Sequence, residues 1–141
     1  MNTWVNQPTV EQLQEFCANT MVDTIGIEFT AIGEDFLSAK MPVDKRTVQP
    51  ARILHGGASV ALAESLGSVA AQLCVDFPAK HCVGLSINAS HVRGVKEGGV
   101  VYGTARPLHL GRSTHLWEIR VEDGEGRLIC ISRLTMAVLD A

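Results

Sequence analysis

Apolar residues between positions 52 and 73 recur with the period of an α-helix, which makes this segment the longest predicted element of the chain. At about 100° per residue, the bulky side chains fall within one narrow arc; they are Leu62, Leu66, Val69 and Leu73. The opposite side carries small residues and a single carboxylate, namely Gly57, Ala61, Glu64, Ser68 and Ala71. A solvated helix face would instead be rich in Lys or Glu. We therefore predict that the bulky side packs on a sheet and that the Glu64 side meets a second helix or a ligand.

The remaining apolar residues mostly alternate with polar ones, which predicts β-strands. The predicted strands are 25–32, 36–43, 82–92, 100–110, 114–122 and 127–139. The clearest alternation places His115, Trp117, Ile119 and Val121 on one face of strand 114–122. Turn residues at 33–35 and 123–126 predict two hairpins. A short amphipathic helix is predicted over 9–20, because residues 9–12 fit the capping-box pattern.

One long helix serves about six strands, so the economical arrangement wraps a single sheet around that helix. The links between strands are too short for helical crossovers, which requires mostly antiparallel pairing. The prediction is an α+β fold in which an antiparallel sheet of about six strands surrounds one long helix, with a short N-terminal helix beside it. No repeat or low-complexity tract divides the sequence, so we expect one domain over residues 1–141.

Charge and composition exclude several classes of function. The formal net charge is −3 and acids are interspersed with bases, so neither nucleic acid nor a membrane surface is an expected partner. No apolar run could span a bilayer and no signal peptide is recognised, which makes the cytoplasm the expected location. The four cysteines lack the spacing of zinc ligands or of a disulfide framework, and we expect core residues at Cys17, Cys74, Cys82 and Cys130.

Several short motifs accompany the long helix in a characteristic order. They are Gln49-Pro50, the run 54–59 (Leu-His-Gly-Gly-Ala-Ser), Ala63-Glu64-Ser65, the run 88–93 and the run 107–112. With the predicted architecture, they resemble the hotdog-fold acyl-CoA thioesterases of the phenylacetate-type group over residues 20–139. The similarity is greatest to the branch that contains the 1,4-dihydroxy-2-naphthoyl-CoA thioesterase of menaquinone synthesis and the proofreading thioesterase of enterobactin synthesis. The resemblance implies hydrolysis of an aromatic or related acyl-CoA to the free acid and CoA, without metal or other cofactor.

Thioester hydrolysis needs a group that attacks the carbonyl or activates water, and donors where the oxyanion develops. Glu64 can supply the first, as nucleophile or as general base, and the sequence leaves both open. The backbone N–H of Gly56 or Gly57, at the start of a helix, can supply the second. The resemblance implies that the Gly56 N–H polarises the carbonyl. It further implies that His55 and Gln49 orient the thioester or the water and that Ser68 holds Glu64 or the water.

A CoA thioester also needs its phosphates and pantetheine held, and Arg guanidinium groups suit phosphate. The resemblance assigns the CoA channel to Gly84 and to two segments: His91, Val92, Arg93 and Gly94, and then His109, Leu110, Gly111, Arg112 and Ser113. The related branch often has Ser-Arg where this chain has Arg-Ser at positions 112 and 113. Which of those two side chains contacts phosphate is therefore left open.

Eight residues separate Gly56 from Glu64, roughly 12 Å along a helix. Both groups must nevertheless lie within about 3 Å of reacting atoms. We therefore predict a homodimer in which Glu64 and Ser68 of one subunit face Gln49, His55 and Gly56 of the other. The resemblance agrees with this shared site and implies that dimers pair into tetramers.

Three alternatives remain open at this point. The thioester could be carried by an aryl acyl carrier protein rather than by CoA. The chain could be a non-catalytic module that binds acyl-CoA, although such sensors usually carry a DNA-binding segment that this sequence lacks. A hotdog hydratase would need an Asp/His pair, whereas this helix offers Glu64 after His-Gly-Gly. The sequence does not identify the acyl group.

Overall fold

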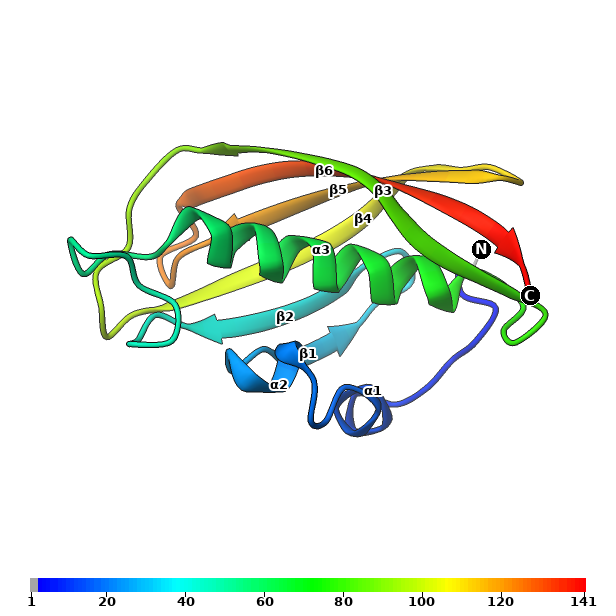
Figure 1. The fold of residues 1–141 in the computed structure, drawn as a ribbon, viewed down its shortest axis with the longest axis horizontal. Helices are drawn as coiled ribbons and strands as arrows, with labels where there is room; N and C mark the ends of the chain where they lie inside the picture. Colours follow the sequence, from blue (N-terminus) through cyan, green and yellow to red (C-terminus); the bar gives the residue numbers. More distant parts are fainter. Residues whose placement is uncertain (1–2) are drawn as a thin grey trace.

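The computed structural model describes residues 3–141, which form a six-stranded sheet and three helices (Figure 1). The helices are α1 (Val10–Phe16), α2 (Met21–Thr24) and α3 (Gly56–Leu73). The strands are β1 (Glu28–Ile32), β2 (Leu37–Pro42), β3 (Lys80–His91), β4 (Val100–Leu110), β5 (Thr114–Glu122) and β6 (Leu128–Asp140). All six predicted strands are present, and the bounds predicted for β4 and β5 are confirmed to the residue.

Three predicted boundaries differ from the structure by three residues or more. The N-terminal helix ends at Phe16 rather than at residue 20. The first strand begins at Glu28 rather than at residue 25, because one helical turn, α2, followed by a turn at Gly26, occupies the segment before it. The long helix begins at Gly56 rather than at residue 52. Arg52 has a φ of 63°, and residues 53 and 54 form isolated β-bridges, so this segment is a loop. The capping box is confirmed, since the Thr9 side chain and the Gln12 side chain each bond the other residue's backbone N–H.

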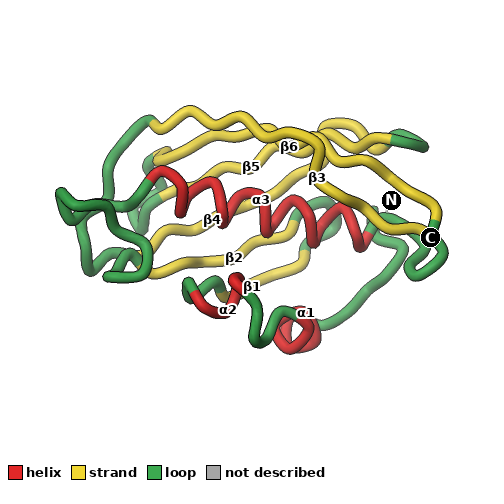
Figure 2. Tube along the Cα trace, in the orientation of Figure 1, coloured by secondary structure: helices red, strands yellow, loops and turns green. Residues whose placement is uncertain are grey.

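The sheet is antiparallel throughout, in the order β1-β2-β4-β5-β6-β3, and it curves around α3. Figure 2 shows α3 along the concave side of the sheet and the two short helices beside β1. The strands β1 and β3 are therefore the two edges of the sheet. This is the predicted α+β hotdog architecture.

The core lies between α3 and the sheet. Leu62 and Leu66 are fully buried, as are Trp117 and Leu134 opposite them. A Cβ atom at Gly67 would lie 2.5 Å from Leu134 Cδ2, so a glycine here lets the helix sit close to the sheet. The buried arc of α3 consequently passes through small residues as well, and Val69, predicted in that arc, is only partly buried. Small residues on this helix therefore also form part of its contact with the sheet.

The N-terminal segment closes the sheet at the C-terminal end of α3. The indole of Trp4 stacks on that of Trp117, with ring centroids 6.2 Å apart, and donates to the Gly33 carbonyl oxygen. The buried His115 lies next to this pair and accepts a hydrogen bond from Trp117 Nε1 at 3.5 Å. Burial, with a contribution from the nearby His109, lowers the pKa of His115 below its usual value of 6.5. All four residues predicted to face inward on β5 are buried, which confirms that alternation.

The four cysteines are free thiols, of which Cys17 and Cys130 are buried while Cys74 and Cys82 are half-buried. Burial raises the pKa of Cys74 to about 12, and it also raises the pKa values of the other three. Burial therefore disfavours the thiolate form of all four, as expected for residues packed in the core or against it. Among residues 3–141, no helix is both long enough and apolar enough to cross a membrane.

Candidate active site

A folded loop between β2 and α3 positions Gln49 and His55. The His55 N–H donates to the Thr47 carbonyl oxygen at 2.8 Å, and the Gln49 N–H donates to the Ile53 carbonyl oxygen at 2.9 Å. The Arg52 guanidinium in the same loop binds the Glu97 carboxylate at 2.6 Å, which ties the loop to the connection between β3 and β4. The loop is thus held at several points, and it presents two of the predicted site residues next to the start of α3.

His55 is the N-cap of α3. Its Nδ1 accepts the Gly57 N–H at 2.8 Å, and its carbonyl oxygen accepts the N–H groups of Ala58 and Ser59. An accepting Nδ1 carries no proton, so the neutral ring must carry its proton on Nε2 and can donate from there. No acceptor for the Gly56 N–H is found among residues 3–141. The first turn therefore has one unused amide donor, at the positive end of the helix dipole.

The Glu64 carboxylate lies against Gly84 of β3. A Cβ atom at Gly84 would be 2.8 Å from Glu64 Oε2 and 4.0 Å from Met136 Sδ. The Ser68 hydroxyl, one turn further along α3, donates to the same Met136 sulfur at 3.8 Å. Glu64, Ser68 and Gly84 thus form one cluster with Met136, and Gly84 leaves the space that the carboxylate fills.

His91, predicted in the CoA channel, lies at the start of α3. A Cβ atom at Gly56 would be 3.0 Å from His91 Nε2. Its imidazole therefore flanks the unused Gly56 amide from the end of β3. The residues that follow it, Val92, Arg93 and Gly94, are exposed.

The predicted site residues fall into three places in one chain. His55, Gly56 and His91 gather at the start of α3, and Gln49 lies in the loop before it. The Glu64 cluster lies two turns later, roughly 12 Å along the helix. The segment 109–113 lies elsewhere, because Ser113 is bonded to Val138 of β6, whereas His91 pairs with Cys130 of β6. Eight residues of strand separate those two positions of β6, which corresponds to roughly 26 Å. A single chain therefore does not bring the two predicted CoA segments together.

Sequence reasoning missed the contact of Met136 with Ser68 and the closeness of Gly84 to the carboxylate. Met136 follows the ordinary inward alternation of β6 and is fully buried, so nothing in the sequence distinguished it from a core residue. Gly84 was expected only as part of a CoA channel. Its neighbour on the helix depends on how α3 lies across the sheet, which spacing along the chain does not specify.

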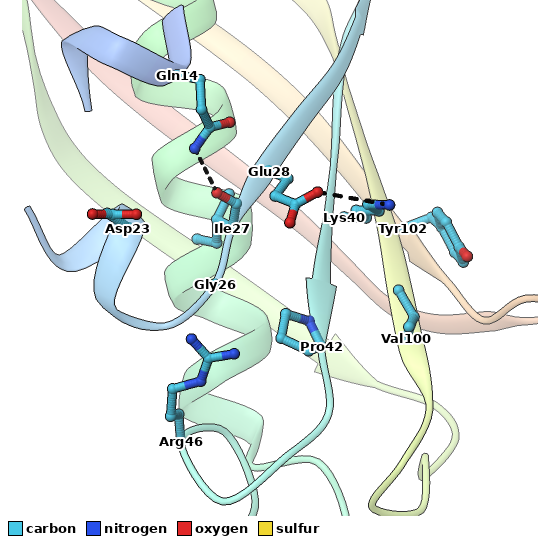
Figure 3. Close-up of a pocket in the computed structure, with 10 residues that line it drawn as sticks. All are labelled: Gln14, Asp23, Gly26, Ile27, Glu28, Lys40, Pro42, Arg46, Val100 and Tyr102. Carbon is cyan, nitrogen blue, oxygen red and sulfur yellow. Dashed lines mark hydrogen bonds and ion pairs between the residues drawn. The ribbon is translucent and has the colours of Figure 1, made fainter. Parts of the chain in front are cut away.

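An open hollow of about 480 Å³ lies on the opposite side of the sheet, between α2, β1, β2 and β4 (Figure 3). Its lining includes Lys40 and Tyr102, which alternate with the buried Met41 and Val101 and therefore point away from α3. Glu28 and Lys40 form an ion pair across it at 3.7 Å. None of the predicted site residues lines this hollow, so we do not assign the chemistry to it.

A sheet wrapped around one long helix defines the hotdog fold. The carboxylate on that helix and the free amide at its start are groups suited to the transfer of an acyl group to water. Residues 51–130 match the model of the thioesterase superfamily, and the chain belongs to that family. It is 52% identical over 136 residues to the 1,4-dihydroxy-2-naphthoyl-CoA hydrolase of Escherichia coli, covering 96% of this chain and 98% of that protein. It is 48% identical to the proofreading thioesterase EntH of Cronobacter turicensis, with the same coverage.

A solved structure gives the same result for the fold. A crystal structure of a glutamine-to-alanine variant of thioesterase PA1618 from Pseudomonas aeruginosa superposes with a TM-score of 0.96 at 50% identity, covering 99% of this chain and 100% of that chain. The predicted resemblance is confirmed, and the protein is a thioester hydrolase.

Proposed function

We propose that the protein hydrolyses an aromatic or related acyl-CoA to the free acid and CoA at two sites shared between two copies. Glu64 of one copy acts on a carbonyl held by the Gly56 N–H and by His55 and Gln49 of the other. The observation that carries this proposal is the unused Gly56 amide beside His91, two helical turns from the only carboxylate on α3. An antiparallel second helix would supply the group that each site lacks.

The chemistry follows from these groups. The Gly56 N–H and the His55 Nε2–H polarise the thioester carbonyl and stabilise the oxyanion. As a general base, Glu64 takes a proton from water while the water oxygen adds to the carbonyl carbon. The tetrahedral intermediate then expels the CoA thiolate, which receives a proton. As a nucleophile, the Glu64 carboxylate would instead attack the carbonyl carbon and expel the CoA thiolate, which receives a proton. The mixed anhydride that results is hydrolysed by water in a second step to the free acid and the Glu64 carboxylate.

CoA would be held by segment 91–94, which is exposed, and by segment 109–113, which is exposed except at Gly111. Arg93 and Arg112 make no ion pair with another group among residues 3–141, so both guanidinium groups are free to meet phosphate. In an antiparallel dimer, the segment 109–113 of one copy approaches the start of α3 of the other. The dimer therefore accounts for two CoA segments that one chain keeps apart. We propose a dimer as the unit that carries the site, with a tetramer as the larger assembly.

Aryl-CoA is the substrate class that we propose, in particular 1,4-dihydroxy-2-naphthoyl-CoA, because the Escherichia coli relative is named for hydrolysis of that thioester. That substrate would place the enzyme in menaquinone biosynthesis. The Cronobacter relative is named a proofreading thioesterase, which favours a second candidate function, proofreading. For this chain we infer that the substrate would then be an aryl group on an acyl carrier protein.

The test is hydrolysis of a panel of thioesters, followed with a thiol reagent and ranked by kcat/KM. The panel contains 1,4-dihydroxy-2-naphthoyl-CoA, benzoyl-CoA, a straight-chain acyl-CoA and an aryl carrier-protein thioester. Glu64→Gln should lower kcat by about 10²–10⁴-fold, whereas Glu15→Gln on the exposed side of α1 serves as the control. Undiminished turnover by Glu64→Gln would remove that residue from its role. A preference for the carrier-protein thioester would replace CoA as the proposed carrier.

A further inference from the structure

One edge of the sheet is occupied by a glutamine side chain. Gln14 of α1 donates from Nε2 to the Ile27 carbonyl oxygen at 3.0 Å (Figure 3) and accepts the Phe29 N–H at Oε1, 2.9 Å away. In a parallel sheet, one residue of a strand bonds two groups of its neighbour. These are the carbonyl oxygen of one residue and the N–H of the residue two positions later. The amide of Gln14 therefore takes the place of a neighbouring strand at the start of β1.

Gln72 of α3 makes the same pair of bonds on the other edge. Its Nε2 donates to the Lys80 carbonyl oxygen at 3.5 Å, and its Oε1 accepts the Cys82 N–H at 3.0 Å. Further along β3, no bond reaches the outer edge between Gly84 and His91 from any residue in the range 3–141. Leu85, 60% exposed, projects from this stretch. The unclamped edge of β3 is thus eight residues long, and open strand edges pair readily with other chains.

A bulge in β3 determines which of its residues share a face. Gly84 pairs with Met136 and Ser86 pairs with Thr135, so Leu85 is an extra residue in the strand. As a result Gly84 and His91 both lie on the side of α3, Gly84 against Glu64 and His91 against Gly56. Directly opposite residues in an antiparallel pair point to the same side of the sheet. Two copies can therefore pair only where residues of the same face meet.

A two-fold axis at Asn88 satisfies this condition across the whole open stretch. It places Ser86 opposite Ser90 of the second copy and, past the bulge, Gly84 opposite His91 of the second copy. Opposed Cα atoms in such a pair are about 5 Å apart. Because Gly84 borders the Glu64 carboxylate and His91 borders the Gly56 amide, this register brings the carboxylate to the amide of the other copy. Lys80 and Cys82 then lie beyond the end of the partner strand. There the Gln72 side chain bonds the Lys80 carbonyl oxygen and the Cys82 N–H.

We propose that Gln14 and Gln72 are edge clamps that confine strand pairing between copies to Gly84–His91, centred on Asn88. Gln14 closes the β1 edge, and Gln72 fixes the register on β3. Both are positioning residues, because they act on catalysis through the arrangement of the two copies. The proposal rests on the shared site of the proposed function, but its test does not use turnover as the primary measurement.

The register is tested by disulfide cross-linking on the face of the sheet away from α3. Asn88→Cys places the thiols of the two copies next to each other at the two-fold axis. Oxidation by copper phenanthroline should therefore give a covalent dimer. Ser86→Cys is the matched control, since in this register the two thiols are roughly 13 Å apart and should not link. The unmodified protein shows the background of the native thiols. A strong Ser86 link, or no Asn88 link in a protein that elutes as a dimer, would overturn the register.

Gln72→Ala is then combined with each cysteine. Without the Gln72 side chain, the edge of β3 that is open to pairing extends from Lys80 to His91. The centre of this open edge then moves from Asn88 to Leu85–Ser86. We expect the Asn88 link to be lost and the Ser86 link to appear, a shift that a purely stabilising role for Gln72 would not produce. An unchanged pattern in a folded Gln72→Ala protein would overturn its role. Circular dichroism establishes that each variant is folded.

Gln14→Ala is examined by light scattering across a range of concentrations, with Glu15→Ala on the same helix as the control. We expect only Gln14→Ala to form assemblies larger than those of the unmodified protein, because it opens the β1 edge. Equal masses for all three proteins would overturn the role of Gln14. Hydrolysis is measured in parallel on reduced Asn88→Cys. An Asn88 link without hydrolysis would count against the proposed function alone, and hydrolysis without the link would count against the register alone.

Discussion

The Gly56 amide can be removed with little change to the helix, which makes its role directly testable. Gly56 is the first residue of α3, a position at which proline is well tolerated. His55 before it has φ −70° and ψ 131°, a conformation that residues preceding proline favour. Among residues 3–141, the Gly56 N–H has no hydrogen-bond acceptor. Gly56→Pro therefore removes no hydrogen bond within the described chain. The substitution therefore deletes one donor and preserves the conformation on both sides of it.

Gly56→Ala is the matched control. Both variants add a Cβ atom 3.0 Å from His91 Nε2, but only alanine keeps the N–H. Loss of one oxyanion donor typically costs about 10²–10³-fold in kcat, or about 2.7–4 kcal/mol. We expect that loss for Gly56→Pro relative to Gly56→Ala, measured as CoA thiol released from benzoyl-CoA. Turnover by Gly56→Pro within about twofold of Gly56→Ala would refute the assignment of the donor, because such a change is far below the loss expected for an oxyanion donor.

The same variant tests whether the site is shared. A dimer of one Gly56→Pro chain and one Glu64→Gln chain keeps one site with both an intact carboxylate and an intact amide. Random mixing of the two chains should restore roughly a quarter of full activity, because half of the dimers are mixed and each has one good site of two. Sites contained within single chains would give no recovery on mixing.

Three further predictions concern the cluster around Glu64, the buried histidine and the core. Gly84→Ala should lower kcat by about 10–100-fold with a small effect on stability, because its Cβ would displace the Glu64 carboxylate, the flexible end of a side chain; equal kcat for Gly84→Ala and the exposed control Gly124→Ala would contradict this. The lowered pKa of His115 should make the free energy of unfolding fall as pH drops below 6.5 toward the folded-state value, because the unfolded chain binds the proton first. Urea titrations at pH 7.5 and 5 should show a smaller loss for His115→Phe than for the unmodified protein, and equal losses would refute the assignment. Leu66→Ala should lower the free energy of unfolding by about 2–5 kcal/mol, whereas Val69→Ala, which is only partly buried, should cost less; urea unfolding at fixed protein concentration measures both, and a larger loss for Val69→Ala would show that the buried face of α3 is wrongly assigned.

The fold was largely predictable because local patterns dictate it. The alternation of His115, Trp117, Ile119 and Val121 requires a strand with one buried face, and all four are buried. The failures came where two local rules compete. Residues 25–27 look like the start of a strand but follow a helical turn, and Arg52 looks helical but adopts a positive φ that only the loop's ion pair and bridges explain.

The candidate site was predictable as a set of residues but not as an arrangement. Spacing along the chain named Glu64 and the amides of Gly56 or Gly57, because a carboxylate on a small-residue helix face and glycines at a helix start are readable from it, whereas His55 and Gln49 were named only by the resemblance to a known family. It could not pair Gly84 with Glu64, His91 with Gly56, or Ser68 with Met136, since these contacts join segments whose distance depends on how α3 crosses the sheet. Nor could it separate segment 109–113 from segment 91–94, which the strand register puts at opposite ends of one chain. Sequence fixes the chemical groups and their local geometry because those depend on neighbours along the chain, whereas tertiary structure alone decides which groups meet.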